Sequence, residues 1–229
     1  MLHFLSEQSS VTLWMIFLAE NVVITIIAIA AGSYVIKRHQ KHKPVASKRE
    51  IVFCIVTNLL NTAITYAGFR LWQHGYIEFS FDINWCTLTD FLLLFMAMDL
   101  AMYLFHYGIH RTIAYRYIHQ LHHAYTNPTP IDLFVLHPLE TLGFGALWLA
   151  MLYVYSFNFA AVLIYLTVNV VYGITGHLGI EPFPARWRNK PLLKYLGTST
   201  FHHRHHSDIH CNFGFYTNIW DKLFKTYKP

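Results

Sequence analysis

The sequence carries groups of histidines whose spacing suits metal binding. Twelve of its sixteen histidines lie between residues 106 and 210. Imidazole suits iron, zinc and copper, and two metals that share a site need roughly eight to ten donors. The stretch FHHRHHSDIHCNFGF (201–215) alone holds five histidines, with no cysteine pair of the zinc-finger kind beside them. This part of the chain is therefore predicted to bind metal.

The histidine groups have helical periodicity. Asp99, Tyr103, His106 and His110 recur at offsets of 0, 4, 7 and 11 in MDLAMYLFHYGIH, and at about 100° per residue these offsets point to one side of a helix. HQLHH and HHRHH share offsets of 0, 3 and 4, which place three rings on one helical face. They supply His119, His122, His123, His202, His205 and His206, while His177 and Glu181 follow a later apolar run. Nine histidines and one carboxylate are thus available as ligands.

Other polar residues are expected to support these ligands. A carboxylate inside a bilayer is costly without a partner, so Asp99 is expected to hydrogen-bond a ligand imidazole, with Tyr103 lining the same channel. His203 points away from its triplet, which favours the surface or a position beside a ligand. His137 precedes a proline, and either orients a ligand or Glu140, or starts a helix.

The elements that position these residues are predicted to lie in a membrane. Hydrophobic residues make up 55% of the 229 residues and charged residues only 13%. A bilayer core about 30 Å thick needs about 20 apolar residues per helix, and lipid leaves backbone polar groups few alternatives to helices. Five runs qualify, at 14–36, 51–72, 88–107, 139–156 and 158–176. The first has no signal-peptide features and is interpreted as a retained anchor. We expect an all-α integral membrane bundle of four or five transmembrane helices with a histidine-rich helical cap.

The basic residues predict which end faces the cytoplasm. Lys and Arg near span ends are retained on the cytoplasmic side. Sixteen of the seventeen fall in segments that this topology places together, including KRHQKHKPVASKR (37–49), and only Arg70 is exceptional. The histidine groups then lie on the cytoplasmic side of a bacterial inner membrane or an endoplasmic reticulum membrane. The net charge of +5 favours anionic lipid headgroups and is poor support for nucleic-acid binding.

The chain is expected to form a single catalytic domain over 1–229. Residues 1–85 supply anchor spans, and 86–229 form the histidine-rich core. The three cysteines form no close pair, so neither a disulfide framework nor a zinc ribbon is predicted.

The order of the motifs resembles a known family. His-x3-His, His-x2-His-His, His-Pro-x-Glu, Gly-His and His-x2-His-His occur in this order in the fatty acid hydroxylase and sterol desaturase superfamily of membrane di-iron proteins. The tail NFGFYTNIWDKLFKT (212–226) is similar to the segment that follows the last histidine box there, notably at Asn212, Gly214, Trp220, Asp221 and Phe224. The resemblance covers about 90–226 and places Asn212 beside the ligands. It implies two irons held by His106, His110, His119, His122, His123, His177, His202, His205 and His206.

Two positions depart from the family pattern. Tyr107 stands where the family often has arginine, and Glu181 stands near a position where some members have another histidine. Either Glu181 or water is therefore expected to complete the metal ligands.

The resemblance implies O2-dependent hydroxylation, or desaturation, of an unactivated C–H bond in a lipid. No residue beyond the metal ligands is assigned a catalytic role. The chain lacks haem, flavin and ferredoxin motifs, so a separate electron donor is expected, either ferredoxin-like or a b-type cytochrome with its reductase. The alternatives are a zinc-dependent membrane hydrolase, because imidazole does not select iron, and a metal-ion transporter, whose ligands would lie near the bilayer midplane.

Overall fold

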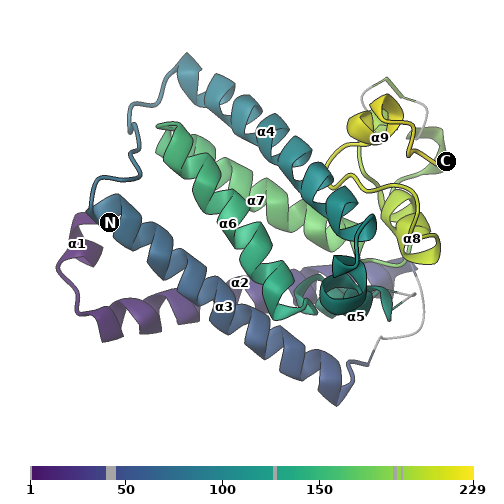
Figure 1. The fold of residues 1–229 in the computed structure, drawn as a ribbon, viewed down its shortest axis with the longest axis horizontal. Helices are drawn as coiled ribbons and strands as arrows, with labels where there is room; N and C mark the ends of the chain where they lie inside the picture. Colours follow the sequence, from purple (N-terminus) through teal and green to yellow (C-terminus); the bar gives the residue numbers. More distant parts are fainter. Residues whose placement is uncertain (1, 40–44, 126–127, 188–189, 192) are drawn as a thin grey trace.

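The described part of the chain consists of helices joined by loops. The computed structural model describes residues 2–39, 45–125, 128–187, 190–191 and 193–229. Five long helices make up its body (Figure 1): α2 (Ser10–His39), α3 (Lys48–Gln73), α4 (Trp85–His110), α6 (Pro138–Val154) and α7 (Phe159–Gly176). The short elements are α1 (Leu2–Ser6), the π-helix η1 (Tyr115–His119), α5 (Gln120–His123), the 3-10 helices η2 (Pro130–Phe134), η3 (Ala185–Trp187) and η4 (Leu193–Tyr195), α8 (Ser199–Ser207) and α9 (Ile219–Leu223).

Four of the long helices, α2, α3, α4 and α7, are long and apolar enough to cross a membrane. Helix α6 is equally apolar in character but has 17 residues, or about 25 Å of helix. Each predicted apolar run lies on one of these five helices. The prediction of an all-α membrane bundle of four or five spans is confirmed.

Polar residues at the ends of the apolar runs start the helices. Ser47 and Glu50 form a capping box at the start of α3, in which each side chain bonds the other's backbone N–H. The side chain of Asn84 caps α4, and that of Asn158 caps α7. His137 caps α6 through its ring Nδ1, which accepts the N–H of Leu139 at 3.2 Å. These caps satisfy N–H groups that a helix start leaves free.

Helices α6 and α7 form a hairpin whose tip lies at the end of the bundle opposite the histidines. The backbone of Ser80, in the loop before α4, pairs with the tip at Asn158. Asp90 of α4 accepts the N–H of Asn158 at 2.7 Å and the hydroxyl of Tyr155 at 3.2 Å. The hairpin therefore runs the length of the bundle from one end to the other, rather than lying shallowly at one face.

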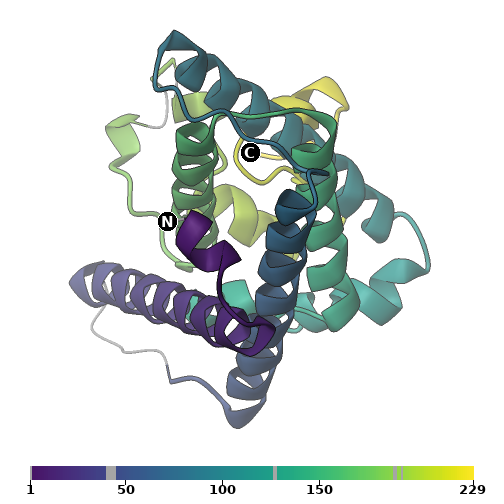
Figure 2. The ribbon, with the colours of Figure 1, turned by 90° about the vertical axis from the view of Figure 1, so that its left-hand side faces the viewer.

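The core forms where this hairpin packs on α4 and on the C-terminal tail. Leu94 and Met98 of α4, Val162 and Tyr165 of α7 and Tyr216 of the tail are buried together. Helix α2 crosses the other long helices obliquely and packs chiefly on α3 (Figure 2). Helices α4, α6 and α7 and the tail thus form a rigid unit that holds the histidine-bearing segments.

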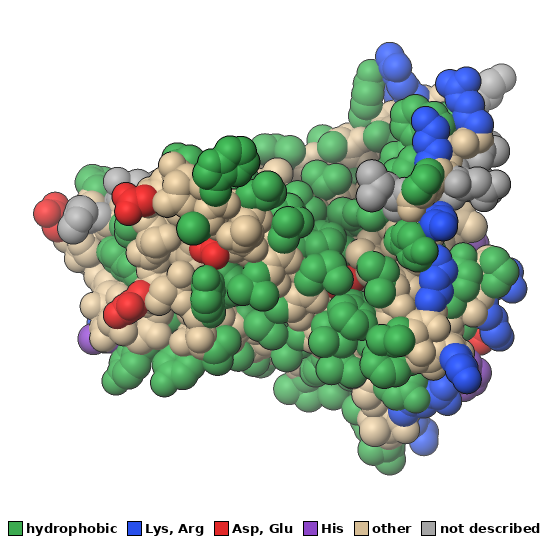
Figure 3. Space-filling view, turned by 90° about the horizontal axis from the view of Figure 1, so that it is seen from above, with side chains coloured by type: hydrophobic (Ala, Val, Ile, Leu, Met, Phe, Trp, Pro, Cys, Tyr) green, Lys and Arg blue, Asp and Glu red, His purple; other side chains and the backbone are tan. Residues whose placement is uncertain are grey.

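The surface is divided by charge along its length. A broad apolar belt covers the middle of the molecule, acidic side chains lie at one end, and Lys and Arg side chains gather at the other, where α8 and α9 lie (Figure 3). Glu78 and Asp82 are exposed in the loop before α4, at the end away from the histidines. Residues 40–44 of the basic loop 37–49 lie outside the described part of the chain. A protein that spans a bilayer needs such a surface, with an apolar belt between two polar ends.

Candidate metal centre

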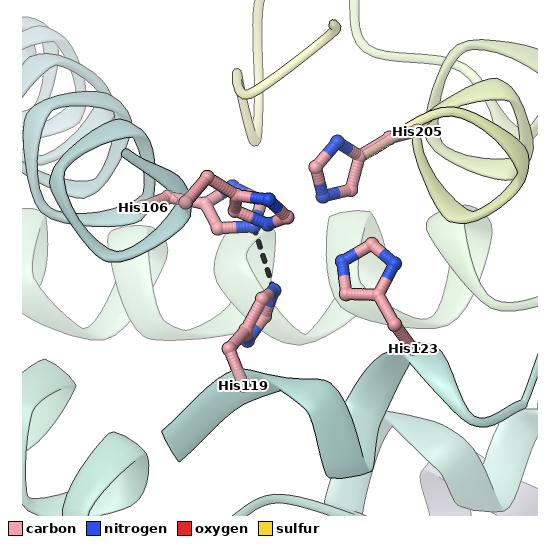
Figure 4. A group of neighbouring side chains, drawn as sticks. His106, His119, His123 and His205 are labelled. Atoms are coloured by element: carbon pink, nitrogen blue, oxygen red, sulfur yellow. Dashed lines mark hydrogen bonds between the residues drawn. The ribbon is translucent and has the colours of Figure 1, made fainter. Parts of the chain in front are cut away.

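The nine predicted histidines meet at the basic end of the bundle, in two adjacent groups. The five-histidine cluster consists of His106, His110, His119, His123 and His205, and the four-histidine cluster consists of His122, His177, His202 and His206. Within each cluster the potential ligand atoms lie within 4.8 Å of one another. Figure 4 shows four rings of the five-histidine cluster converging from α4, from the η1–α5 segment and from α8. The two clusters adjoin, since the ring centroids of His123 and His206 are 4.9 Å apart.

Each His-x2-His-His motif contributes to both clusters. His119 and His123 belong to the five-histidine cluster, and His122 between them belongs to the other. In α8 the division is reversed, because His205 joins the five-histidine cluster while His202 and His206 join the four-histidine cluster. Two short helical segments on opposite sides of the clusters therefore hold both groups together.

Hydrogen bonds to the outer nitrogens orient the rings. Backbone carbonyl oxygens only accept, so the Nδ1 of His106 donates to Phe213 O at 2.9 Å and that of His177 donates to Gly173 O at 2.8 Å. The Nδ1 of His205 donates in the same way to Cys211 O at 2.7 Å. With Nδ1 protonated, each neutral ring turns an Nε2 lone pair toward its cluster, as ring orientation in metal sites requires.

The Glu140 side chain orients the His119 ring in the same way as these carbonyl oxygens. Its Oε1 accepts from the Nδ1 of His119 at 2.7 Å, and both side chains are buried. The Nε2 of His119 then lies 2.9 Å from the Nε2 of His106 (Figure 4), so two lone pairs face each other. In the four-histidine cluster the Nε2 atoms of His122 and His177 face each other at 3.4 Å, with both Nδ1 atoms bonded to carbonyl oxygens. Facing lone pairs repel unless a proton or a cation lies between them.

A proton between these rings is disfavoured by burial. Desolvation lowers the pKa of His122 and of His177 to about 4, and the neighbouring His177 ring contributes to the lowered pKa of His122. Burial, together with His106 and His122, also holds the pKa of His119 well below 6.5. These imidazoles are therefore neutral at physiological pH, the form in which they bind metal.

Other ring nitrogens in the clusters are buried without a partner among the described residues. Both nitrogens of His110 and of His123 are in this state, as are Nε2 of His205 and Nδ1 of His206. A buried polar atom without a partner costs about 1–3 kcal/mol, and several in one place call for a ligand that accepts lone pairs. Nine neutral imidazoles in groups of five and four fit two iron ions, and they would also accommodate other metals that imidazole binds.

The structure gives Asp99 and Tyr103 different partners from those expected. Asp99 accepts from the N–H groups of Tyr216 and Thr217, at 2.9 and 3.2 Å, and from the Thr217 hydroxyl and the Trp220 indole. The Tyr103 hydroxyl bonds that of Thr226 at 3.0 Å. Both side chains hold the C-terminal tail against α4 rather than contacting a ligand ring, because the tail folds back along α4 and offers these donors.

Glu181 lies outside both clusters, which corrects its assignment as a possible ligand. Its carboxylate accepts from the backbone N–H and the hydroxyl of Thr200, in the first turn of α8, and from the N–H of Phe183. A carboxylate at a helix N-terminus is stabilised by the unpaired N–H groups there. Glu181 thus fixes the start of α8 and supports the ligands only through that helix.

The remaining candidates occupy supporting positions. His137 caps α6 through its ring, as the helix-start interpretation expected, and its carbonyl accepts the N–H of Glu140. Asn212 has a φ of 58°; its side chain donates to Phe201 O and Lys228 O and accepts the N–H of Lys228. It joins the α8 segment to the chain's last residues. His203 is half-buried, and its Nδ1 has no partner among the described residues.

The carbonyl acceptors for the ligand rings were not predicted from the sequence. Phe213, Cys211, Gly173 and Val135 act through backbone oxygens, which every residue type carries. The residue type at these positions therefore gives no signal. The closest signal for these acceptors in the sequence is that the tail follows directly after the last histidine motif.

Comparison with known proteins finds relatives that are named as sterol enzymes. The mouse lathosterol oxidase is 28% identical over 191 residues, which cover 79% of this chain and 60% of the relative. Methylsterol monooxygenase 1 of Danio rerio is 30% identical over 128 residues, covering 56% of this chain and 43% of the relative. The Delta(7)-sterol 5(6)-desaturase of Leptosphaeria maculans is 28% identical over 135 residues, covering 57% and 34% respectively.

The chain spans roughly a third to three fifths of the length of these relatives. No solved structure matches it. The stretch 91–226, which holds all nine clustered histidines and the tail whose carbonyls orient His106 and His205, matches the fatty acid hydroxylase family. This chain belongs to the fatty acid hydroxylase family.

Proposed function

We propose that this protein is an oxidoreductase that oxidises an unactivated C–H bond of a lipid with O2, using iron held in its two histidine clusters. The observation that carries the proposal is the pair of adjacent clusters with lone pairs turned inward, buried at one end of a bundle of apolar helices. The relatives' names support it, since they describe an oxidase, a monooxygenase and a desaturase of sterols.

The protein's part is to hold and shield the reaction centre. Iron bound by the nine histidines would supply O2 activation and removal of hydrogen from carbon. Glu140 and the carbonyl oxygens of Phe213, Cys211 and Gly173 fix the ring directions, so the ligands need no reorganisation. Eight of the nine clustered histidines are buried, which excludes bulk water from the centre.

The electron balance requires a partner. Hydroxylation consumes the lipid, O2, two electrons and two protons and yields the alcohol and water; desaturation with the same inputs yields an alkene and two waters. We propose that the electrons come from a separate ferredoxin-like protein or b-type cytochrome. The described residues include no cysteine set or haem motif that would carry them.

The substrate proposed first is a sterol or a similarly apolar lipid. The three relatives all have sterol names, and they are named as an oxidase, a desaturase and a monooxygenase. The clusters lie at the ends of α4 and α7, whose flanks expose apolar side chains such as Leu104 and Val171. A membrane lipid therefore reaches the centre without leaving an apolar environment. We further propose that the histidine end faces the cytoplasm, because the exposed Lys and Arg side chains gather there.

Two other classes fit less well. A zinc hydrolase needs three or four ligands and a carboxylate free to act as a base, whereas Glu140 is bonded to His119. A transporter needs ligands near the bilayer midplane, whereas the histidines on α4 occupy its last two turns and the others follow spans or lie in the tail.

Metal analysis and lipid analysis together test the proposal. The protein is purified in lipid nanodiscs, loaded with Fe(II) and analysed by elemental mass spectrometry, with about two irons per chain expected. It is then supplied with a ferredoxin, its reductase, O2 and a mixture of sterols and fatty acids. An oxygenated or desaturated lipid that requires both O2 and iron is the expected result. Stoichiometric zinc, or no O2-dependent lipid product from iron-loaded protein, would overturn the proposal.

A further inference from the structure

A narrow hollow reaches the four-histidine cluster from the side of α7. It is lined by the ligands His177 and His202 and by Tyr172, Gly176 and Phe215. The hollow has room for about one methyl-sized group. A second hollow, lined by Phe183, Trp187, Leu193 and Leu196, adjoins it at Thr198, which lines both. An apolar surface therefore leads up to two metal-ligand rings.

Gly176 leaves this space open. It is the last residue of α7. Its φ is not positive, and a Cβ there would meet nothing nearer than the His202 ring, at 3.4 Å. Gly173, one turn earlier, differs, because a Cβ there would lie 2.6 Å from the Leu133 side chain. A side chain at 173 would thus displace Leu133, whereas at 176 the missing side chain leaves room beside His202.

Aromatic rings fix the opposite wall of the hollow. Phe215 packs against Phe144 and Tyr216, with ring centroids 6.1 and 5.9 Å away, and lies 6.3 Å from the His202 ring. Tyr172 packs on Tyr216 at 5.4 Å. Tyr216 is itself tied to α4 by its backbone bond to Asp99. A wall anchored in this way holds its shape, so the size of the group admitted depends on position 176.

We propose that the lipid presents its reacting carbon to the four-histidine cluster through this hollow, and that Gly176 is a specificity-determining residue. The inference rests on the proposed function and adds the side and the cluster at which the substrate is received. The adjoining second hollow, lined by apolar side chains such as Phe183 and Leu196, gives the rest of an apolar chain a surface to lie on. A methyl or methylene group fits the space, whereas a lipid headgroup is too large for it.

Substitutions at Gly176 test the inference. Gly176→Ala adds one methyl at ordinary contact distance from His202, and Gly176→Leu fills the hollow. The matched control is Gly108→Leu, because Gly108 is also a helical glycine beside ligands, on α4, and a Cβ there meets nothing within 4 Å. Iron content and melting temperature are measured first. Gly176→Ala and Gly108→Leu are expected to match the wild type in both, because a Cβ at 176 meets nothing nearer than 3.4 Å and one at 108 meets nothing within 4 Å. A leucine at 176 is larger than the hollow, so Gly176→Ala carries the test if Gly176→Leu loses iron.

Photolabelling locates the lipid without requiring turnover. Wild-type protein and variants in nanodiscs are irradiated with a fatty acid carrying a diazirine in its chain, and separately with a diazirine sterol. Labelled peptides are identified by mass spectrometry. At least one probe is expected to label the peptides that contain Tyr172 and Phe215. Labelling falls about tenfold or more in Gly176→Leu, falls less in Gly176→Ala and is unchanged in Gly108→Leu.

The outcomes separate this inference from the proposed function. Labelling at the hollow that depends on position 176 supports the inference even if iron-loaded protein yields no oxidised lipid, a result that would overturn the proposed function alone. Wild-type labelling and wild-type product formation in an iron-loaded Gly176→Leu variant would overturn the inference and leave the proposed function standing. So would labelling confined to other faces of the bundle.

Discussion

At the scale of single residues, the direction of each imidazole is set by the group that its outer nitrogen bonds. Glu140 is the one side chain among these acceptors in the described structure, and the others are backbone carbonyls. A side-chain acceptor can be removed by mutation, which makes His119 the ligand whose orientation is most directly testable.

Glu140→Ala is expected to weaken iron binding by about 10–100-fold, because the His119 ring loses the acceptor that directs its Nε2. Glu140→Gln keeps an amide oxygen that accepts the same bond and is expected to lose less. Chelator competition against Fe(II) gives the affinities. Glu181→Gln serves as the control, because its amide oxygen still accepts from Thr200 and holds the start of α8, so the affinity is expected to stay unchanged. Wild-type affinity in Glu140→Ala would contradict the orienting role.

Asp132 provides a prediction about pH. Its pKa is raised from 3.8 to about 7, first by burial and then by the neighbouring Glu50 carboxylate, while bonds from Thr129 oppose the shift. Between about pH 4 and pH 7 the unfolded chain has released this proton and the folded protein keeps it. The free energy of unfolding contributed by this group therefore falls as pH rises through that window.

Asp132→Asn carries no charge at any pH and keeps an oxygen for the bonds from Thr129. The stability of the variant relative to wild type is expected to increase from pH 5 to pH 8, measured by thermal unfolding in detergent. The histidine contributions are common to both proteins and cancel in the difference. Asp82→Asn, at an exposed position, is expected to parallel the wild type. If the stability of Asp132→Asn and of the wild type changed in parallel with pH, the Asp132 carboxyl of the folded wild type would be ionised over the whole range from pH 5 to pH 8.

The residue types of the metal centre could be predicted from the sequence, but their grouping could not. Spacing placed His119, His122 and His123 on one helical face, and all three do reach the centre. Spacing alone does not tell that His122 belongs to one cluster and its neighbours to the other, because that depends on where α8 packs. The predicted partner of Asp99 was wrong for a similar reason, because the groups that donate to Asp99 lie more than a hundred positions away in the chain.

At the scale of elements, the C-terminal tail acts as a brace between α4 and the ligands. Asp99 holds the tail at Tyr216, Thr217 and Trp220, and the tail presents Phe213 O to His106. Asp221 binds the N–H groups of Phe213 and Gly214, both at 2.8 Å, which fixes the loop that carries this carbonyl. The carboxylate in the span therefore supports a ligand indirectly, through the fold of the tail.

Asp99→Asn is expected to loosen this brace. An asparagine oxygen can still accept the two backbone N–H groups, but its NH2 faces the Thr217 hydroxyl and the Trp220 indole, which both donate to Asp99. A loss of about 1–3 kcal/mol in unfolding free energy follows from the unpaired donors. Iron affinity and proteolysis of the tail are both expected to change, because Phe213 O moves with the tail.

Asp90→Asn is the matched control for this variant. Asp90 is also buried on α4 and also accepts a backbone N–H, but it holds the hairpin tip at the opposite end. Its substitution is expected to reduce stability while iron affinity and tail proteolysis stay at wild-type values. Equal effects of the two variants on iron binding would mean that Asp99 acts on general stability alone.

The long helices followed from the sequence, as did the helical form of the HQLHH and HHRHH segments, whereas the other short elements did not. Apolar runs of about 20 residues have one stable form in lipid, so α2, α3, α4, α6 and α7 could be placed within a few residues. The π-helix η1, the short helices η3 and η4 and the loop after α8 depend on tertiary hydrogen bonds, such as that from Asn218 to Lys194 O. No local sequence pattern predicts such bonds.

At the scale of the whole molecule, the two ends differ in both charge and chemistry. The nine clustered histidines lie at the end with most of the exposed basic side chains, including Arg111, Arg116 and Arg204, and Glu78 and Asp82 lie at the other. Because basic residues near spans are retained on the cytoplasmic side, the centre is expected to face the compartment in which soluble electron donors circulate.

The native cysteines allow this orientation to be tested. Cys86, in the first turn of α4, is exposed, while Cys54 and Cys211 are buried. Helix α4 has 26 residues and is about 39 Å long, so its ends extend beyond a hydrocarbon core of about 30 Å. A membrane-impermeant maleimide is expected to label Cys86 in intact spheroplasts of a bacterial host, and Cys86→Ser is expected to abolish that labelling.

The opposite end supplies the second half of the test. Lys222 lies exposed in α9, beside the histidine end, so Lys222→Cys in the Cys86→Ser background is expected to react only after the membrane is permeabilised. The reverse pattern, in which the Lys222→Cys variant is labelled in intact spheroplasts, would place the metal centre outside. The electron donor would then have to be an extracytoplasmic protein, because two electrons per turnover must reach the clusters from the side on which they open.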